Sequence, residues 1–198
     1  MGKFNLSNKY KAIVIGGSAG SFQPVTKLLS KIPKSFPLPI FLCLHRLKHV
    51  RHGFVEALSI KSNKPVVEPA DKESIKRGNV YLAPANYHMG IELGNSVSLT
   101  TDDLVNNSRP SIDVMFETAA YAYRDKLIGI LLSGANKDGA LGMAKIKYHG
   151  GTTVIQDPEE SMINTMPSAA QNYTKVDYCL VTEEIIKFML ELNSIYKD

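Results

Sequence analysis

The chain has 198 residues, and at roughly 150 residues per domain this length favours a single domain over 1–198, with its core between about residues 11 and 192. Hydrophobic residues make up 44% and charged residues 21%, which excludes a largely disordered chain, and the longest apolar runs are too short to cross a bilayer. The net charge of +4 is spread along the chain, which predicts neither a nucleic-acid-binding surface nor insertion into a membrane.

Four short apolar runs predict buried strands of a parallel sheet. They are rich in β-branched or large apolar residues and lack the two-residue alternation of a half-exposed strand. The runs cover residues 12–15, 40–44, 127–132 and 152–155.

Amphipathic patterns between these runs predict helices. Pro24 fits the first turn of a helix that ends near residue 29, and Pro110 fits the first turn of one that ends at residue 123. Residues 140–149 form a third pattern, closed by two glycines, and residues 183–192 a C-terminal one. The alternation of strands and helices predicts a doubly wound, Rossmann-like three-layer α/β fold with a mainly parallel sheet.

The middle of the chain has shorter strand patterns. They cover residues 66–67, 80–82, 90–93 and 97–99. Gly94 and Asn95 fit a two-residue turn between the last two. This pattern predicts an antiparallel hairpin at the edge of the same sheet.

Three residues that could carry chemistry each follow a predicted strand. Ser18 follows the first strand, His45 the second and Asp138 the third. Ligands of open α/β sheets bind beyond the carboxyl ends of the strands, so these side chains are expected at one edge. A hydroxyl, an imidazole and a carboxylate are the parts of a nucleophile, base and orienting acid. Ser18 also lies in a Gly-x-Ser-x-Gly spacing, which formally matches a nucleophile elbow.

Each of these residues has a simpler interpretation when it is considered alone. The glycine-rich segment around Ser18 is typical of a tight or phosphate-binding turn, and His45 could be a packed histidine at a strand end. Asp138 could be a turn residue or the N-cap of the helix that follows it. Their shared location at three strand ends favours catalysis, because none of the simpler roles requires it.

Other chemistries fit the sequence less well, and we predict neither a cofactor nor a metal. The early glycines do not have dinucleotide-binding spacing, and the second strand ends in His45 where an acidic residue is expected. A metal site made by His45, His49 and His52 is disfavoured by the basic residues between them. In an ordinary α/β-hydrolase the acid precedes the histidine, whereas here Asp138 comes last.

The two cysteines indicate the redox state of the compartment in which the protein functions. Cys43 and Cys179 lie far apart in apolar or strand-like segments and form no disulfide framework or metal motif. This usage predicts a reducing, cytoplasmic setting.

Several motifs together make the chain resemble the catalytic domain of the chemotaxis receptor methylesterases, the CheB family. The motifs follow the order of the family and cover about residues 11–192. They are IGGSAG at 15–20, LH at 44–45, GNVYLAP at 78–84, HM at 88–89, RPSIDVMF at 109–116, LLSGANKDGA at 131–140 and MPSAA at 166–170.

This resemblance implies an α/β domain and a hydrolytic reaction. Such enzymes cleave methyl esters of glutamate side chains on helical cytoplasmic regions of receptors, release methanol, and in many cases deamidate glutamines. By position in the motifs, Ser18 would be the nucleophile, His45 the base and Asp138 the orienting acid.

The resemblance also implies how a substrate would be held. The backbone N–H groups near Ala19 and at Ala135 would face the oxyanion. Arg109 falls in a motif that borders the site, and would contact an acidic face of the substrate.

Departures from the family pattern leave a second, non-enzymatic hypothesis open. Ser21 stands where the family usually has glycine, and the residues beside His45 and at Ala135 differ from the usual ones. Only about ten residues precede the first strand, too few for the receiver domain of regulated members. We therefore expect a free-standing esterase or a piece of a longer protein. The alternative is a weak or inactive methylesterase-like domain that serves as a signalling binding module.

Overall fold

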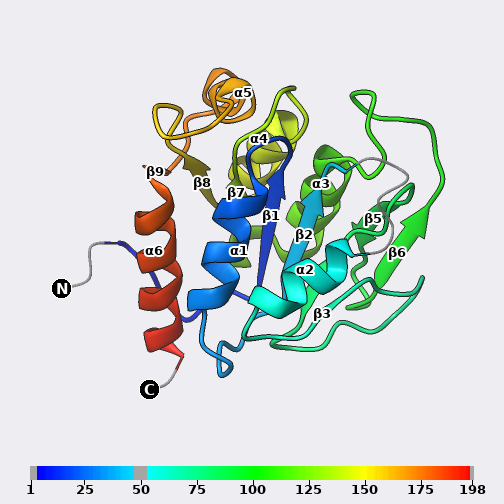
Figure 1. Cartoon of the computed structure of the whole chain (residues 1–198), viewed down its shortest axis with the longest axis horizontal. Coiled ribbons are helices and arrows are strands. Elements are labelled where there is room, and N and C mark those ends of the chain that lie inside the picture. Colours follow the sequence, from blue (N-terminus) through cyan, green and yellow to red (C-terminus); the bar gives the residue numbers. More distant parts are fainter. Residues whose placement is uncertain (1–3, 47–52, 197–198) are drawn as a thin grey trace.

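A parallel β-sheet forms the centre of the computed structural model, which describes residues 4–46 and 53–196 (Figure 1). Its strand order is β3-β4-β2-β1-β7-β8-β9, and every neighbouring pair is parallel. The strands are β1 (Ala12–Gly17), β2 (Ile40–Leu44), β3 (Val66–Val67), β4 (Val80–Leu82), β7 (Leu127–Leu131), β8 (Thr152–Gln156) and β9 (Tyr178–Leu180). The four apolar runs are therefore confirmed as parallel strands.

Helices cover both faces of this sheet, as the doubly wound prediction requires. One face packs against α1 (Phe22–Lys31), α2 (Phe54–Lys61) and α6 (Thr182–Ile195). The other packs against α3 (Ile112–Tyr123), α4 (Ala140–Tyr148) and α5 (Thr165–Tyr173). Successive residues of β1 alternate between the two cores, because Ile13 and Ile15 belong to the first and Ala12 and Val14 to the second. Among the helices of the described residues, none has the length and apolar character to cross a bilayer.

The hairpin does not lie where the sequence predicted it. β5 (His88–Ile91) and β6 (Val97–Thr100) pair with each other in a separate antiparallel sheet instead of joining the edge of the large one. That edge is already occupied by β3, and the hairpin packs beside α3, where the Thr118 hydroxyl accepts the Ile91 N–H at 3.1 Å. The turn also has three residues instead of two, with Asn95 in the left-handed region at a φ of 61°.

The predicted helix ends are mostly correct. Pro24 lies in the first turn of α1, and α4 ends before Gly150, which adopts a φ of 82°. The prediction for Pro110 was wrong, because this residue precedes the helix and Ser111 is the N-cap of α3. The Ser111 hydroxyl accepts the Val114 N–H, as a capping serine does.

The order of the strands determines where a site can form. β1 lies between β2 and β7, so the chain continues to one side of β1 first and reaches the other side much later. The carboxyl ends of these three strands meet at the point where the strand order reverses, which is the usual ligand position in such sheets.

Candidate active site

Ser18 and His45 extend neighbouring strands at the carboxyl edge of the sheet. Gly17 pairs with Leu44, so the next residue on each strand is one of the two candidates. The His45 N–H donates to the Gly17 carbonyl at 3.1 Å, and the Ser18 N–H donates to the Ser133 carbonyl at 2.9 Å. Since adjacent strands lie about 4.8 Å apart, Ser18 and His45 are side by side.

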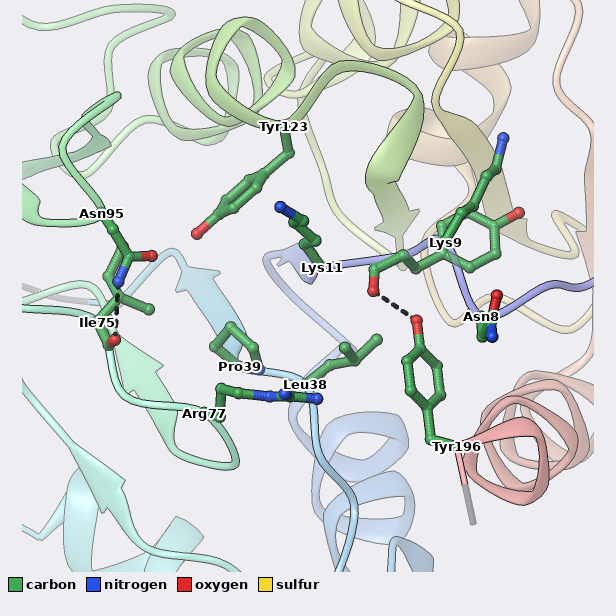
Figure 2. Close-up of a pocket in the computed structure, with 11 residues that line it drawn as sticks. Asn8, Lys9, Lys11, Leu38, Pro39, Ile75, Arg77, Asn95, Tyr123 and Tyr196 are labelled. Atoms are coloured by element: carbon green, nitrogen blue, oxygen red, sulfur yellow. Dashed lines mark hydrogen bonds between the residues drawn. The ribbon is translucent and has the colours of Figure 1, made fainter. Parts of the chain in front are cut away.

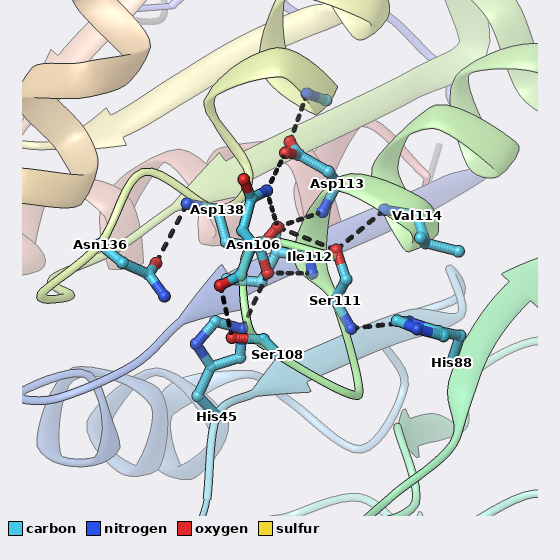
Figure 3. A network of polar contacts seen from close by, with 11 residues as sticks. His45, His88, Asn106, Ser108, Ser111, Ile112, Asp113, Val114, Asn136 and Asp138 are labelled. Atoms are coloured by element: carbon cyan, nitrogen blue, oxygen red, sulfur yellow. Dashed lines mark hydrogen bonds and ion pairs between the residues drawn. The ribbon is translucent and has the colours of Figure 1, made fainter. Parts of the chain in front are cut away.

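His45 and Asp138 are in direct contact, although 93 residues separate them in the chain. The His45 Nε2 and Asp138 Oδ2 atoms are 2.8 Å apart, with Asp138 fully buried (Figure 3). An ionised carboxylate only accepts hydrogen bonds, so Nε2 carries the hydrogen of a neutral ring and Nδ1 keeps its lone pair. The structure thus joins the predicted base and acid, and the roles of Ser18 as nucleophile and of His45 as its base stay predictions.

Asp138 lies at the N-terminus of α3, a position that the sequence did not predict. Its carboxylate accepts the backbone N–H of Ile112 at 2.7 Å and that of Asp113 at 3.2 Å. The Ser111 hydroxyl donates to it at 2.9 Å and the Asn106 amide at 3.0 Å. The positive end of the helix dipole adds to these donors. The N-cap interpretation of Asp138 for α4 is therefore wrong, because this carboxylate serves the neighbouring helix.

These contacts keep Asp138 ionised. Burial alone raises the pKa of the Asp138 carboxyl, but the hydrogen bonds from His45, Ile112 and Asn106 outweigh burial and hold the pKa below the ordinary value of 3.8. An ionised carboxylate can fix the orientation of the His45 ring and stabilise the imidazolium that forms when the ring takes a proton.

Several residues that support Asp138 were not among those predicted from the sequence. Asn106 and Ser111 donate to Asp138, and His88 supports Ser111 by accepting its backbone N–H at 3.1 Å. The buried Asp113 accepts from the same Asn106 amide at 2.8 Å. The signal that could have revealed Asp113 is its place as the lone acidic residue in the apolar first turn of α3.

The turn that carries Ser18 is closed by a local contact. The Ser18 carbonyl accepts both the hydroxyl of Ser21, at 2.6 Å, and its N–H, at 3.0 Å. A Cβ atom on Gly17 would lie 2.5 Å from the Ser21 Cβ, closer than real atoms approach. Gly17 therefore allows this turn to fold back over the end of β1.

We expect Gly17→Ala to destabilise the fold by about 2 kcal/mol, because the added methyl group must push the Ser21 turn away. Urea denaturation measures this change. Gly94→Ala is the matched control, since a Cβ there would meet nothing closer than the Ser96 hydroxyl at 3.9 Å. Equal stability of the two variants would contradict the close packing of this turn.

Backbone groups beside the two predicted oxyanion donors already have hydrogen-bond partners within the protein. The Ser133 hydroxyl donates to the Ala19 carbonyl at 2.8 Å, and the Gly134 N–H donates to the Ile163 carbonyl at 3.1 Å. Ala19 and Ala135 are both exposed, and within residues 4–46 and 53–196 neither backbone N–H donates a hydrogen bond. Both N–H groups are therefore available to a ligand, and their role at an oxyanion stays a prediction.

Arg109 is strongly tied to the protein itself. Its guanidinium donates to the carbonyls of Thr101 and Asp102 at 2.6 and 2.8 Å, and to the Asn86 side chain at 3.0 and 3.3 Å. These bonds hold the loop over residues 101–110, which carries Asn106. The predicted contact of Arg109 with an acidic substrate stays a prediction.

The site is not distinguished by the size of a cavity. A cavity of about 410 Å³ lies at the opposite edge of the sheet, where Lys11 precedes β1, Pro39 precedes β2 and Tyr123 ends α3 (Figure 2). Another, of about 310 Å³, adjoins the Asp138 network and is lined by Asn106 and Asp113 among others. The chemistry of the side chains, and not the volume, favours the carboxyl edge.

A metal centre finds no support in the part of the chain that the structure describes. No group of three or more His, Cys, Asp or Glu side chains there is placed to hold an ion. His49 and His52, which were considered with His45 as ligands, lie outside the described residues. The contact of His45 with the buried carboxylate of Asp138 instead matches a base and its orienting acid.

Comparison with known proteins gives consistent matches over almost the whole chain. The family model described as CheB methylesterase matches residues 13–189. A protein of Leptospira interrogans is 44% identical over 184 residues, which cover 93% of this chain and 95% of that protein. The protein-glutamate methylesterase/protein-glutamine glutaminase of Thermotoga maritima is 33% identical over 189 residues, covering 92% of this chain but 54% of the relative.

A solved structure matches the fold as well as the sequence. The crystal structure of the Thermotoga maritima CheB methylesterase catalytic domain superimposes with a TM-score of 0.87 at 33% identity. The match covers 92% of this chain and 98% of that domain.

Proposed function

This chain belongs to the CheB methylesterase family, and from that premise we propose that it hydrolyses glutamate methyl esters on a protein substrate. Ser18 is the nucleophile, His45 the base and Asp138 the orienting acid. The observation that carries this proposal is the 2.8 Å contact of His45 Nε2 with the buried Asp138, next to the strand end that bears Ser18.

The proposed reaction has two halves. In the first, Ser18 Oγ attacks the ester carbonyl carbon while His45 Nδ1 takes the hydroxyl proton, and the C–O bond to methoxide breaks as His45 returns that proton to form methanol. In the second, a water molecule attacks the acyl-enzyme, His45 takes its proton, and the glutamate leaves as Ser18 regains a hydrogen. Asp138 stays ionised throughout and stabilises the imidazolium.

Backbone groups would stabilise the tetrahedral intermediate. We assign this role to the N–H groups of Ala19 and Ala135, which have no partner in the described residues and lie after β1 and β7. Preorganised backbone donors of this kind each contribute about 3 kcal/mol to the stabilisation of an oxyanion.

The substrate that we propose is a helical cytoplasmic region of a methylated chemoreceptor. Names of the relatives also include glutaminase activity, and the same acyl-enzyme would form from a glutamine side chain with release of ammonia. Met162 is 80% exposed and lies against Gly20, beside the Ser18 turn. Its exposed side chain offers an apolar contact to a helix.

Methanol release from a methylated receptor cytoplasmic fragment tests the function. We expect one molecule of methanol for each methyl ester cleaved, and covalent labelling of Ser18 by a fluorophosphonate probe. A base-activated serine reacts with the ester and with the probe. Methanol formation by a protein whose Ser18 stays unlabelled would contradict the mechanism. The absence of both methanol and label would contradict hydrolysis and favour a binding module.

A further inference from the structure

The first turn of α3 carries a second buried carboxylate, that of Asp113. It lies beside Asp138, which precedes α4. Asp113 accepts the backbone N–H of Gly142, in the first turn of α4, at 2.7 Å. Asp138 precedes α4 but accepts the first N–H groups of α3. The two helices therefore exchange carboxylates at their N-termini (Figure 3).

One side-chain amide lies between the two carboxylates. Asn106 Nδ2 donates to Asp113 Oδ2 at 2.8 Å and to Asp138 Oδ1 at 3.0 Å. An amide NH₂ group has two hydrogens, so each carboxylate receives one. The backbone of Asn106 is left-handed, with a φ of 50°, a conformation that asparagine tolerates better than most residues.

The two carboxylates differ in how tightly they hold a proton. Burial raises the pKa of Asp113 to about 6, and the charge of Asp138 contributes to the rise against the hydrogen bonds from Gly142 and Asn106. The hydrogen bonds from His45 and Ile112 hold the pKa of Asp138 below its ordinary value. On acidification the first proton therefore goes to Asp113, and Asp138 keeps its charge.

Several other ionisable groups lie around Asp113. Glu117, one turn further along α3, pairs with Lys145 of α4 at 3.5 Å. Lys137 and Tyr173 line the same cavity as Asp113, and His45 contacts the other carboxylate, Asp138. Asn106 is thus the side chain that connects the two carboxylates.

We propose that Asn106 and Asp113 are positioning residues for Asp138, an inference that rests on the hydrolase function proposed above. Asn106 separates the two like charges and holds Asp138 with its Oδ2 atom toward His45. Asp113 anchors the other side of the amide and takes the proton that the pair gains in acid. Both residues act through Asp138 and touch no part of the ester.

Asn106→Gly and Asn107→Gly form a matched pair of variants. Both positions are left-handed, with φ values of 50° and 60°, and glycine fits both backbones. The exposed Asn107 makes no side-chain hydrogen bond within the described ranges. We expect Asn106→Gly to lower kcat about tenfold with little change in KM, and Asn107→Gly to behave as the wild type.

The pH dependence separates positioning from a purely structural role. Loss of the shared hydrogen bond makes Asp138 a stronger proton acceptor, which favours the protonated form of its partner His45, so the acid limb of the kcat profile of Asn106→Gly moves to higher pH. Adding Asp113→Asn leaves one carboxylate, and the acid limb of the double variant returns to the wild-type position or below. Equal losses in the two asparagine variants, an unmoved acid limb, or a shift that persists in the double variant would overturn the proposal.

A substrate-free measurement distinguishes this proposal from the proposed function. The ¹⁵N resonances of the His45 ring report the protonation of the ring, which depends on the charge of its partner Asp138, whether or not the ester is cleaved. We expect their acid transition to move to higher pH in Asn106→Gly and to match the wild type in Asn107→Gly. Superimposable titrations of all three proteins would refute the positioning role. Absence of methanol and of a Ser18 label in the wild type refutes the function alone.

Discussion

Ser18→Ala is expected to lower kcat for methyl ester hydrolysis by at least about 10⁴-fold, because no other group replaces the attacking oxygen. The fold should be unaffected, since the contacts of this residue in the turn are made by its backbone N–H and carbonyl. Methanol release under single-turnover conditions measures the loss, and thermal unfolding checks the fold.

Ser21→Ala is the matched control for this variant. It removes a neighbouring serine hydroxyl, which donates to the Ser18 carbonyl, but leaves the nucleophile in place. We expect it to retain most of the activity.

The losses caused by variants within the triad should not add. A Ser18→Ala, His45→Ala double variant should therefore be about as inactive as Ser18→Ala alone. A double variant that is inferior by another factor of about 10³ would mean that His45 acts independently of Ser18.

Asp138→Asn should impair both activity and folding. An amide presents hydrogens to His45 and Ile112, or else to Asn106 and Ser111, all of which donate to the carboxylate in the wild type. The His45 ring then loses the partner that fixes its tautomer, which lowers kcat by about 10⁴-fold in a triad of this kind. Buried donors without an acceptor also lower the free energy of unfolding by about 3 kcal/mol.

The stability loss in Asp138→Asn should depend on pH in one direction. The folded-state pKa of Asp138 lies below its ordinary 3.8, so its contribution is present above that pH and disappears as the pH falls through the folded pKa. Asp113 has the opposite sign, because its pKa is raised to about 6 and the native state holds the extra proton between pH 3.8 and that value. Urea denaturation at pH 8 and below pH 3.8 therefore separates the contribution of Asp138 to the free energy of unfolding from that of Asp113. An equal difference between wild type and Asp138→Asn at both pH values would contradict a stabilising, ionised Asp138.

Local sequence patterns predicted the scaffold and the edge of the site. The strands were correct because residues such as Val14 and Phe41 are buried between two layers of helices, and a doubly buried strand has a recognisable composition. Ser18 and His45 could be placed together because parallel strands end at one edge. The antiparallel hairpin was predicted correctly, but its placement at the sheet edge was wrong, because nothing in residues 88–100 shows that the short β3 already occupies that edge.

The surroundings of Asp138 could not be predicted in the same way. Its bond to the Ile112 N–H spans 26 residues of sequence and exists only because α3 and α4 pack together. Asn106 lies in an irregular loop, where composition gives no indication that its amide faces two carboxylates. Such contacts depend on tertiary packing, which the hydrophobic periodicity and the secondary-structure propensities of the sequence do not encode.

The exchange of carboxylates between α3 and α4 makes the N-termini of these two helices a single cooperative unit. Neither helix N-terminus can fray without exposing the acid that holds the other, so partial opening of one end would also release His45 from its partner. Slow hydrogen exchange at the Ile112 and Gly142 amides should therefore disappear together when the unit opens. For engineering, an inactive protein that still captures its substrate is better made at Ser18, which lies outside this unit, than at Asp138, which helps to hold it together.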